Sequence, residues 1–289
     1  MRDRLLWLQS TKSGLCDRLM DLILLSSLAK INNQDLYLKW HQGDDLSFGD
    51  YQKETWPSYR WTDYLLENVQ NYFSLPENVK FINPDTKFEK PSIFDKYLGG
   101  VYSPKTFYQL RDMNIDYEQF YNVYRDTIGQ FKPKQKLLNL IDPTEQIDLA
   151  VHLRRTDKVN FNPNGVEIHN SELKKLNDIT LRCVVEEIEK TKKQKKVLIC
   201  SDDDKAKMDL QSRIQDKCIV VDSPKVNYEF EKTYVDLIMF SQSKKIIMSQ
   251  KHSNFSIFAS LMHEAELVYF YKDNNFILNS SLPFYIYYD

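Results

Sequence analysis

The segment from Ile147 to Lys158 places a short apolar run directly before a dense cluster of polar and charged side chains. The run Ile147–Val151 has the length and composition of a buried strand. The cluster consists of an imidazole, two guanidiniums, a carboxylate and an ammonium, on His152, Arg154, Arg155, Asp157 and Lys158. Guanidiniums bind phosphate oxygens in pairs and stay charged, so this strand end suits a polyanion such as a nucleotide pyrophosphate. A solvated strand end with a salt bridge is the alternative.

From residue 147 onward, apolar runs alternate with segments of helical periodicity. This alternation predicts a parallel sheet that is covered by helices on both faces. We expect strands at 147–151, 197–200, 218–221, 245–248 and 267–270, the last strand, and helices at 171–190, 204–214, 234–241 and 256–263. A strand, helix and strand at 4–9, 17–30 and 36–40 predict a further β-α-β unit at the start of the chain.

The stretch between residues 42 and 145 is less regular and is rich in Tyr, Trp, Asn and Pro. Within it, Val79–Ile82 is predicted to form a strand and Tyr117–Gln130 a helix. A chain of 289 residues is long enough for two medium-sized domains. We therefore predict an α/β fold with one domain over residues 1–145 and a second over residues 146–289.

Four polar clusters each follow a predicted strand. Because ligands of parallel sheets bind beyond the carboxyl ends of the strands, we expect these clusters to lie on one rim. They are the residues 13–18, 152–158, 201–204 and 249–256.

Two of these clusters have more than one interpretation. The triplet Asp202-Asp203-Asp204 suits a magnesium ion, a ribose or base edge, or the cap of the helix that follows it. The residues 249–256 offer hydroxyls and backbone amides at a helix N-terminus, which suits either a phosphate group or ordinary capping.

Composition excludes several other classes of protein. The net charge of −2 argues against a dedicated nucleic-acid binder, and the run Lys192–Lys196 is interpreted as a solvated turn. The sequence contains neither a GxGxxG motif nor a Walker loop, and no apolar stretch is long enough to span a membrane. The four cysteines lack zinc spacing and are expected to be buried free thiols, so we expect a cytoplasmic protein.

The clusters together resemble motifs of the fucosyltransferase superfamily, most closely its α-1,6-fucosyltransferase and Nod-factor branch. The residues 152–159 nearly match that family's motif His-Val-Arg-Arg-Thr-Asp-Lys-Val. Four further segments resemble family motifs in the same order and spacing: 13–19, 199–203, 235–242 and 253–259. The resemblance covers residues 4–40 and 147–265, and the middle of the chain matches nothing recognised.

This resemblance implies a GT-B-like arrangement in which two Rossmann-type α/β domains face each other across a cleft. The second domain would bind the donor, typically GDP-fucose, and transfer would invert the anomeric centre without a metal. By position, Arg154 would bind the β-phosphate, and His152 and Asp236 would contact the base or nucleotide. The other implied donor-binding residues are Gly14, Arg18, Arg155, Ser201, Asp202, Asp203, Ser253, Phe255 and Ser256.

The position of the family's catalytic glutamate is occupied here by Asn162. Glu167 is the next carboxylate, and we predict it to be the base, with Lys158 as its orienting partner. Asp157 lies between Arg155 and Lys158, which would depress its pKa and make it a structural brace, although it stays the alternative base.

The resemblance thus implies a metal-independent, inverting glycosyltransferase that transfers fucose from GDP-fucose to a glycan hydroxyl. The nucleotide sugar is a co-substrate, and no cofactor is expected. The alternatives are a transferase of another nucleotide sugar, such as UDP-xylose, and a catalytically inactive protein that binds a nucleotide sugar or a glycan. The aromatic side chains of residues 42–145 are interpreted either as an acceptor site, because their faces suit sugar rings, or as core.

Overall fold

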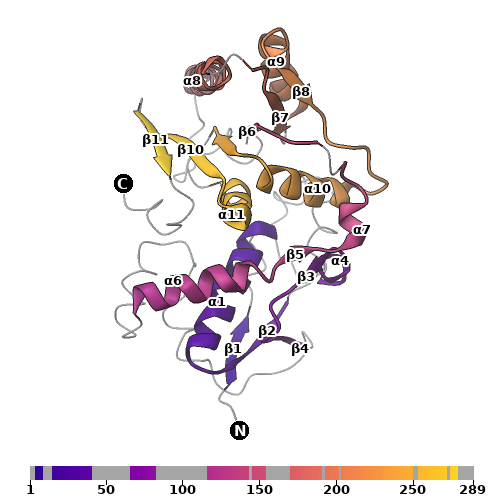
Figure 1. Cartoon of the computed structure of the whole chain (residues 1–289), viewed down its shortest axis with the longest axis vertical. Coiled ribbons are helices and arrows are strands. Elements are labelled where there is room, and N and C mark those ends of the chain that lie inside the picture. Colours follow the sequence, from indigo (N-terminus) through magenta and orange to yellow (C-terminus); the bar gives the residue numbers. More distant parts are fainter. Residues whose placement is uncertain are drawn as a thin grey trace. The chain divides into compact units, whose positions relative to one another are not determined.

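The structure is a computed structural model of the chain. It divides into two compact units (Figure 1). The described residues are 4–8, 15–40, 66–82, 116–142, 145–153, 170–190, 193–201, 203–249, 253–271 and 274–278. The first unit contains the described residues up to Asn139 together with Asn227–Thr233. The second unit contains Leu140–Val226 and the described residues from Tyr234 onward.

The first unit is built on three parallel strands, β1 (Arg4–Leu8), β2 (Asp35–Lys39) and β4 (Val79–Ile82), in the order β1-β2-β4. The helix α1 (Leu15–Ile31) connects β1 to β2, because parallel neighbours need a long crossover. The remaining elements are α4 (Leu66–Tyr72), β3 (Phe73–Ser74), α6 (Tyr117–Ile128), β5 (Lys132–Pro133) and α7 (Gln135–Leu138).

The helix α1 forms the core of the first unit. Leu19, Leu22 and Ile23 are fully buried, as expected for a helix that is apolar on nearly all sides. The helix α6 packs against it, and Lys30 Nζ donates a hydrogen bond to Thr127 Oγ1 at 3.0 Å. The two helices are therefore joined by both apolar and polar contacts.

The second unit holds a sheet of six strands in the order β11-β10-β9-β6-β7-β8. The strands are β6 (Leu149–Leu153), β7 (Lys196–Ser201), β8 (Ile219–Val221), β9 (Lys245–Met248), β10 (Glu266–Tyr271) and β11 (Asn274–Leu278). The helices are α8 (Asn170–Glu189), α9 (Asp204–Ile214), α10 (Glu229–Ser241), whose first residues belong to the first unit, and α11 (Asn254–His263).

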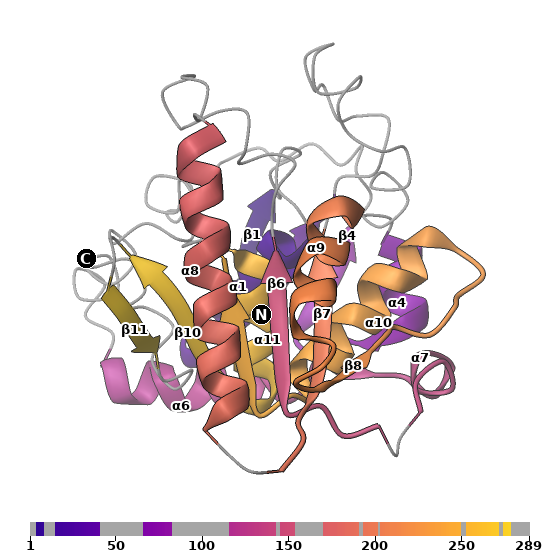
Figure 2. The same cartoon turned by 90° about the horizontal axis from the view of Figure 1, so that it is seen from above.

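The strand order of this sheet is that of the Rossmann fold. The chain runs outward from β6 through β7 to β8, and then returns to the other side of β6 as β9 and β10. These five strands are parallel, and β11 pairs antiparallel with β10. The helices α8 and α9 cover one face of the sheet, and α10 and α11 cover the other (Figure 2).

The core of the second unit lies on the central strands. Val151, Ile199 and Ile247 are fully buried and pack with Val184 of α8 and Ile214 of α9. Apolar runs without polar alternation form such strands because helices exclude water from both faces of the sheet.

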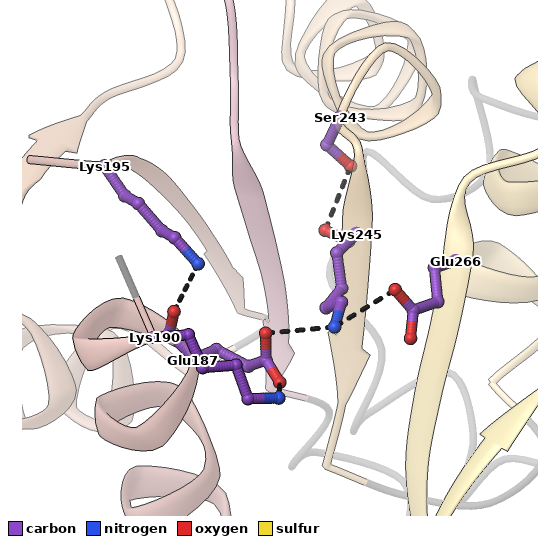
Figure 3. Close-up of polar contacts among 6 residues, drawn as sticks. All are labelled: Glu187, Lys190, Lys195, Ser243, Lys245 and Glu266. Carbon is purple, nitrogen blue, oxygen red and sulfur yellow. Dashed lines mark hydrogen bonds and ion pairs between the residues drawn. The ribbon is translucent and has the colours of Figure 1, made fainter. Parts of the chain in front are cut away.

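Charged side chains gather where β9 and β10 begin (Figure 3). Lys245 Nζ lies 2.9 Å from Glu187 Oε2 and 3.0 Å from Glu266 Oε2, and Lys190 also pairs with Glu187. We call Glu187, Lys190, Lys245 and Glu266 the amino-end cluster. Burial alone raises the pKa of Glu187, but hydrogen bonds from Lys190 and Lys245 outweigh it and hold that pKa below its ordinary value.

Most of the predicted elements are confirmed, including the helix at Asp204–Ile214 and the strands at Val79–Ile82 and Lys245–Met248. The expectation of buried free thiols is also confirmed for all four cysteines, Cys16, Cys183, Cys200 and Cys218.

The predicted boundaries of several elements were wrong. The strand expected at Ile147–Val151 is β6, which runs from Leu149 to Leu153, because pairing with β7 and β9 continues past Val151. The helix α10 begins at Glu229 rather than at residue 234. The run 267–270, expected to be the last strand, lies in β10, and β11 follows it and pairs antiparallel with it.

Candidate functional site: the sheet switch point of the second unit

The candidate site lies where β6 and β9 run side by side. At this point the strand order reverses, and sheets of this kind bind ligands beyond the carboxyl ends of the strands there. His152 is the fourth residue of β6 and pairs with Met248 at the end of β9. The backbone N–H of Ser249 donates to His152 O at 3.0 Å, which extends the pairing of the two strands. His152 therefore belongs to the rigid strand rather than to the loop after it.

The imidazole of His152 is held by two hydroxyls. Its Nδ1 lies 2.8 Å from Ser256 Oγ and 2.9 Å from Ser253 Oγ. Whether Nδ1 donates or accepts depends on the ring tautomer, and in either case the two contacts fix the orientation of the ring. Both contacts use Nδ1, and Nε2 is the other polar atom of the ring.

Two aromatic rings support the imidazole. The centroid of the His152 ring lies 5.2 Å from that of Phe255 and 6.0 Å from that of Phe240. The two phenyl rings meet edge to face, with 5.5 Å between their centroids. We call His152, Phe240, Ser253, Phe255 and Ser256 the switch-point cluster.

Ser253 stands at the N-cap of α11, yet its side chain makes no capping hydrogen bond. Its hydroxyl contacts His152 instead. Ordinary capping, one interpretation of residues 249–256, is therefore wrong for the hydroxyl of Ser253. The first amide groups of a helix and its dipole favour an anion.

Ser201 and Asp203 make local structural bonds at the end of β7. Ser201 Oγ donates to Leu153 O at 2.8 Å and accepts from the backbone N–H of Asp203 at 3.0 Å. The Asp203 carboxylate accepts from the amides of Lys205 and Ala206, at 2.9 and 3.1 Å. The capping interpretation of the aspartate triplet is thus confirmed for Asp203.

Asp236 of α10 accepts a hydrogen bond from Ser223 Oγ. The thiol of Cys200, at the end of β7, lies beside it. Burial raises the pKa of Cys200, and the neighbouring Asp236 carboxylate raises it further. Asp236 is therefore tied to the strand ends from two sides.

Ser223, Cys200 and Phe240 were not predicted to be site residues. Phe240 and Cys200 belong to apolar runs that are typical of core. Ser223 lies in a loop of ordinary composition. The local sequence therefore contains no signal that distinguishes them from structural residues.

Arg18 belongs to the first unit, where it is fully buried on α1. Its guanidinium carbon lies 5.6 Å from the ring centroid of Trp40, within the range of a cation–π interaction. Its predicted role in donor binding stays a prediction.

Seven predicted site residues lie outside the described part of the chain: Gly14, Arg154, Arg155, Asp157, Lys158, Glu167 and Asp202. Asn162 lies outside it as well. Among the described residues, no group of three or more His, Cys, Asp or Glu side chains is arranged to hold a metal ion. Within the same residues, no helix has both the length and the apolar character that crossing a membrane requires.

Comparisons with known proteins find no matching family model and no matching curated protein. Solved structures do match. The α-1,6-fucosyltransferase NodZ co-crystallised with GDP has a TM-score of 0.58 and 14% identity, over 96% of this chain and 99% of that one. The same enzyme soaked with GDP-fucose gives a TM-score of 0.57 at 14% identity, with the same coverage of both chains.

A third match is a plant protein. A mutant of Arabidopsis thaliana FUT1 in complex with GDP has a TM-score of 0.55 and 13% identity, over 95% of this chain and 71% of that one. At identities of 13–14%, these likenesses establish the fold. The predicted resemblance is confirmed at that level: this chain has the α/β fold of the solved fucosyltransferases.

Proposed function

We propose that the chain is an inverting, metal-independent glycosyltransferase that moves fucose from GDP-fucose to a hydroxyl of a glycan acceptor. The observation that carries this proposal is His152, oriented by Ser253 and Ser256 at the switch point of a Rossmann-type sheet. The likeness to NodZ, solved with GDP and with GDP-fucose, supports the choice of donor.

In this proposal the second α/β domain binds the donor, and the first faces it across a cleft and binds the acceptor, as in GT-B enzymes. His152 and Asp236 contact the base or nucleotide, and Ser253 and Ser256 line the donor pocket beside the N-terminus of α11. That helix end attracts the diphosphate, because its amides and its dipole favour negative charge.

The chemical step is a direct displacement at the anomeric carbon. The acceptor oxygen forms its bond to that carbon while the bond to the nucleotide diphosphate breaks, and the configuration inverts. Arg154 and Arg155 neutralise the charge that develops on the leaving diphosphate, so that positive side chains do the work a metal would otherwise do. Glu167 takes the proton of the acceptor hydroxyl, oriented by Lys158, while Asp157 braces the loop.

The donor is tested by thermal shift with a panel of GDP-, UDP-, CMP- and ADP-sugars. We expect a selective rise in Tm with GDP-fucose and GDP, because a ligand that binds the folded state stabilises it. Transfer is then measured as release of GDP in the presence of a glycan mixture. A rise with UDP-sugars alone would replace fucose by another sugar, such as xylose, and leave the fold unaffected.

The base is tested by comparing Glu167→Gln with Asp157→Asn. Each substitution removes one ionisable carboxylate and keeps the shape of the side chain. We expect transfer to fall strongly in Glu167→Gln while GDP binding stays normal. Full transfer by this variant, with a loss in Asp157→Asn, would make Asp157 the base.

Asn162 favours a second candidate function, because it occupies the position of the family's catalytic glutamate. A chain without a base would bind a nucleotide sugar or a glycan and leave it unchanged. GDP-fucose binding without transfer, and without slow donor hydrolysis, would support that function over the enzyme.

A further inference from the structure

Tyr228 is an exposed aromatic side chain of the first unit. Three large apolar side chains are exposed in the described part of the chain, and Tyr228 is the aromatic one among them, with 60% of its surface accessible; the other two are Met208 and Ile219. Tyr228 ends the loop that follows β8 and directly precedes α10. An exposed tyrosine is unremarkable alone, so its support matters.

A second ring fixes the ring of Tyr228. Phe230 stacks on it with 5.5 Å between centroids and an angle of 14° between the ring planes. Phe230 in turn meets Tyr72 edge to face at 5.9 Å. Tyr72 is buried, and the ammonium of Lys136 lies 4.3 Å from its ring centroid. The exposed ring is thus the outermost member of an aromatic stack that is anchored in the interior of the unit.

The backbone beneath Tyr228 is held by a buried carboxylate. Glu231 is 4% exposed, and its Oε2 accepts from the amides of Asn227 and Tyr228, each at 3.2 Å. Its Oε1 accepts a hydrogen bond from the hydroxyl of Tyr72. A buried carboxylate is costly to desolvate unless it is hydrogen bonded. Here its bonds join the loop to the aromatic stack.

A rigid, exposed aromatic face suits the apolar face of a sugar ring. The face of an aromatic ring carries partial negative charge. The axial C–H hydrogens of a pyranose carry partial positive charge and point toward that face when the two rings stack. A face that is already fixed loses little entropy when a ligand stacks on it. β-linked gluco-configured rings offer such C–H bonds on both faces.

We propose that Tyr228, supported by Phe230, Tyr72 and Glu231, is a stacking platform for a pyranose ring of the glycan acceptor. The identification of this ring as part of the acceptor rests on the proposed function. The binding of a sugar ring rests on the stack itself. Tyr72 lies within residues 42–145, for which the sequence predicts an acceptor site, whereas Tyr228, Phe230 and Glu231 belong to the range predicted for the donor domain. The structure groups Asn227–Thr233 with Tyr72 in the first unit.

The experiment is saturation-transfer NMR with cellotetraose, a short chain of β-linked glucose, on the whole protein. Tyr228→Ala removes the ring, and Tyr228→Phe keeps it without the hydroxyl. Tyr121→Ala is the matched control, because it removes a half-buried tyrosine from α6 of the same unit. GDP binding is measured on each sample by calorimetry.

We expect saturation of the sugar ring protons in the wild type, in Tyr228→Phe and in Tyr121→Ala. In Tyr228→Ala it should fall between about three- and tenfold, the range expected for one aromatic contact. No saturation in the wild type, or equal saturation in Tyr228→Ala, would overturn the platform. The NMR measurement needs no turnover. Sugar binding by a chain that fails to bind GDP would therefore refute the proposed function and leave the platform supported.

Discussion

The two ends of the six-stranded sheet differ in the kind of polar group that they bring together. At the amino end, Glu187 and Lys245 form an ion pair in which both side chains are largely buried. Asp148 pairs there with Lys244 at 2.7 Å, and Glu145 with Lys196 at the same distance. At the carboxyl end, the switch-point cluster is built from hydroxyls, an imidazole and phenyl rings.

This difference indicates that the amino end contributes to stability and the carboxyl end to ligand binding. Opposite charges at the amino end satisfy one another, so they hold α8 against the first residues of β9 and β10. The hydroxyls and the imidazole of the switch-point cluster suit the recognition of an anionic ligand. Substitutions at the amino end should therefore change stability, and those at the carboxyl end should change donor binding.

The largest effect is expected for Arg154→Ala. Loss of one group that stabilises charge in the transition state typically lowers turnover by about a hundred- to a thousandfold. Arg213→Ala makes the same change at an exposed ion pair with Asp209, and we expect its transfer rate to stay within about twofold of the wild type. Equal rates for Arg154→Ala and the wild type would remove Arg154 from the proposed mechanism.

A smaller effect is expected for His152→Ala. The substitution removes the ring that Ser253 and Ser256 orient, and the affinity for GDP should fall about ten- to a hundredfold, the range for a hydrogen bond to a charged ligand group. Calorimetry with GDP measures the affinity, and thermal unfolding shows whether the fold is kept. Unchanged affinity in a folded variant would separate this cluster from the donor site.

The opposite result is expected for Lys245→Met at the amino end. Glu187 keeps its contact with Lys190 but loses the buried one, so the free energy of unfolding should fall by about 1–2 kcal/mol. GDP affinity should stay unchanged, because the substitution lies at the other end of the strands. A variant of wild-type stability, or one with weaker GDP binding, would break the contrast between the two ends.

Much of this fold could be predicted from the sequence, because local patterns determine it. The apolar runs of β7 and β9 and the periodicity of α9 depend on residues close together in the chain. Pairing between distant strands does not, and for that reason the extension of β6 through Leu153 and the presence of β11 were missed.

Residues of the candidate site could be predicted only where the type of side chain itself suggests a chemical role. His152 and Ser256 were found because polar residues follow apolar strands. Phe240 was not, since a phenylalanine in an apolar helix is typical of core until another strand brings an imidazole against it. Tyr228 was missed for a similar reason, because its stack depends on Tyr72, which lies far away in the sequence.

The smallest effect concerns acid. Hydrogen bonds from Lys190 and Lys245 hold the pKa of Glu187 below its ordinary value of 4.5 despite burial. The folded chain therefore binds this proton less readily than the unfolded chain, so the group stabilises the fold above about pH 4.5, and this stability is lost as the pH falls through the lowered pKa.

Glu187→Gln removes the titration, so its Tm should be lower at neutral pH and should fall less between about pH 5 and pH 3 than that of the wild type. Glu189, which lies on the same helix as Glu187, forms an exposed ion pair with Lys217, and Glu189→Gln should follow the wild-type profile. Thermal unfolding across this range measures the difference, and parallel profiles for Glu187→Gln and the wild type would mean that the acid sensitivity of the fold arises elsewhere than in the amino-end cluster.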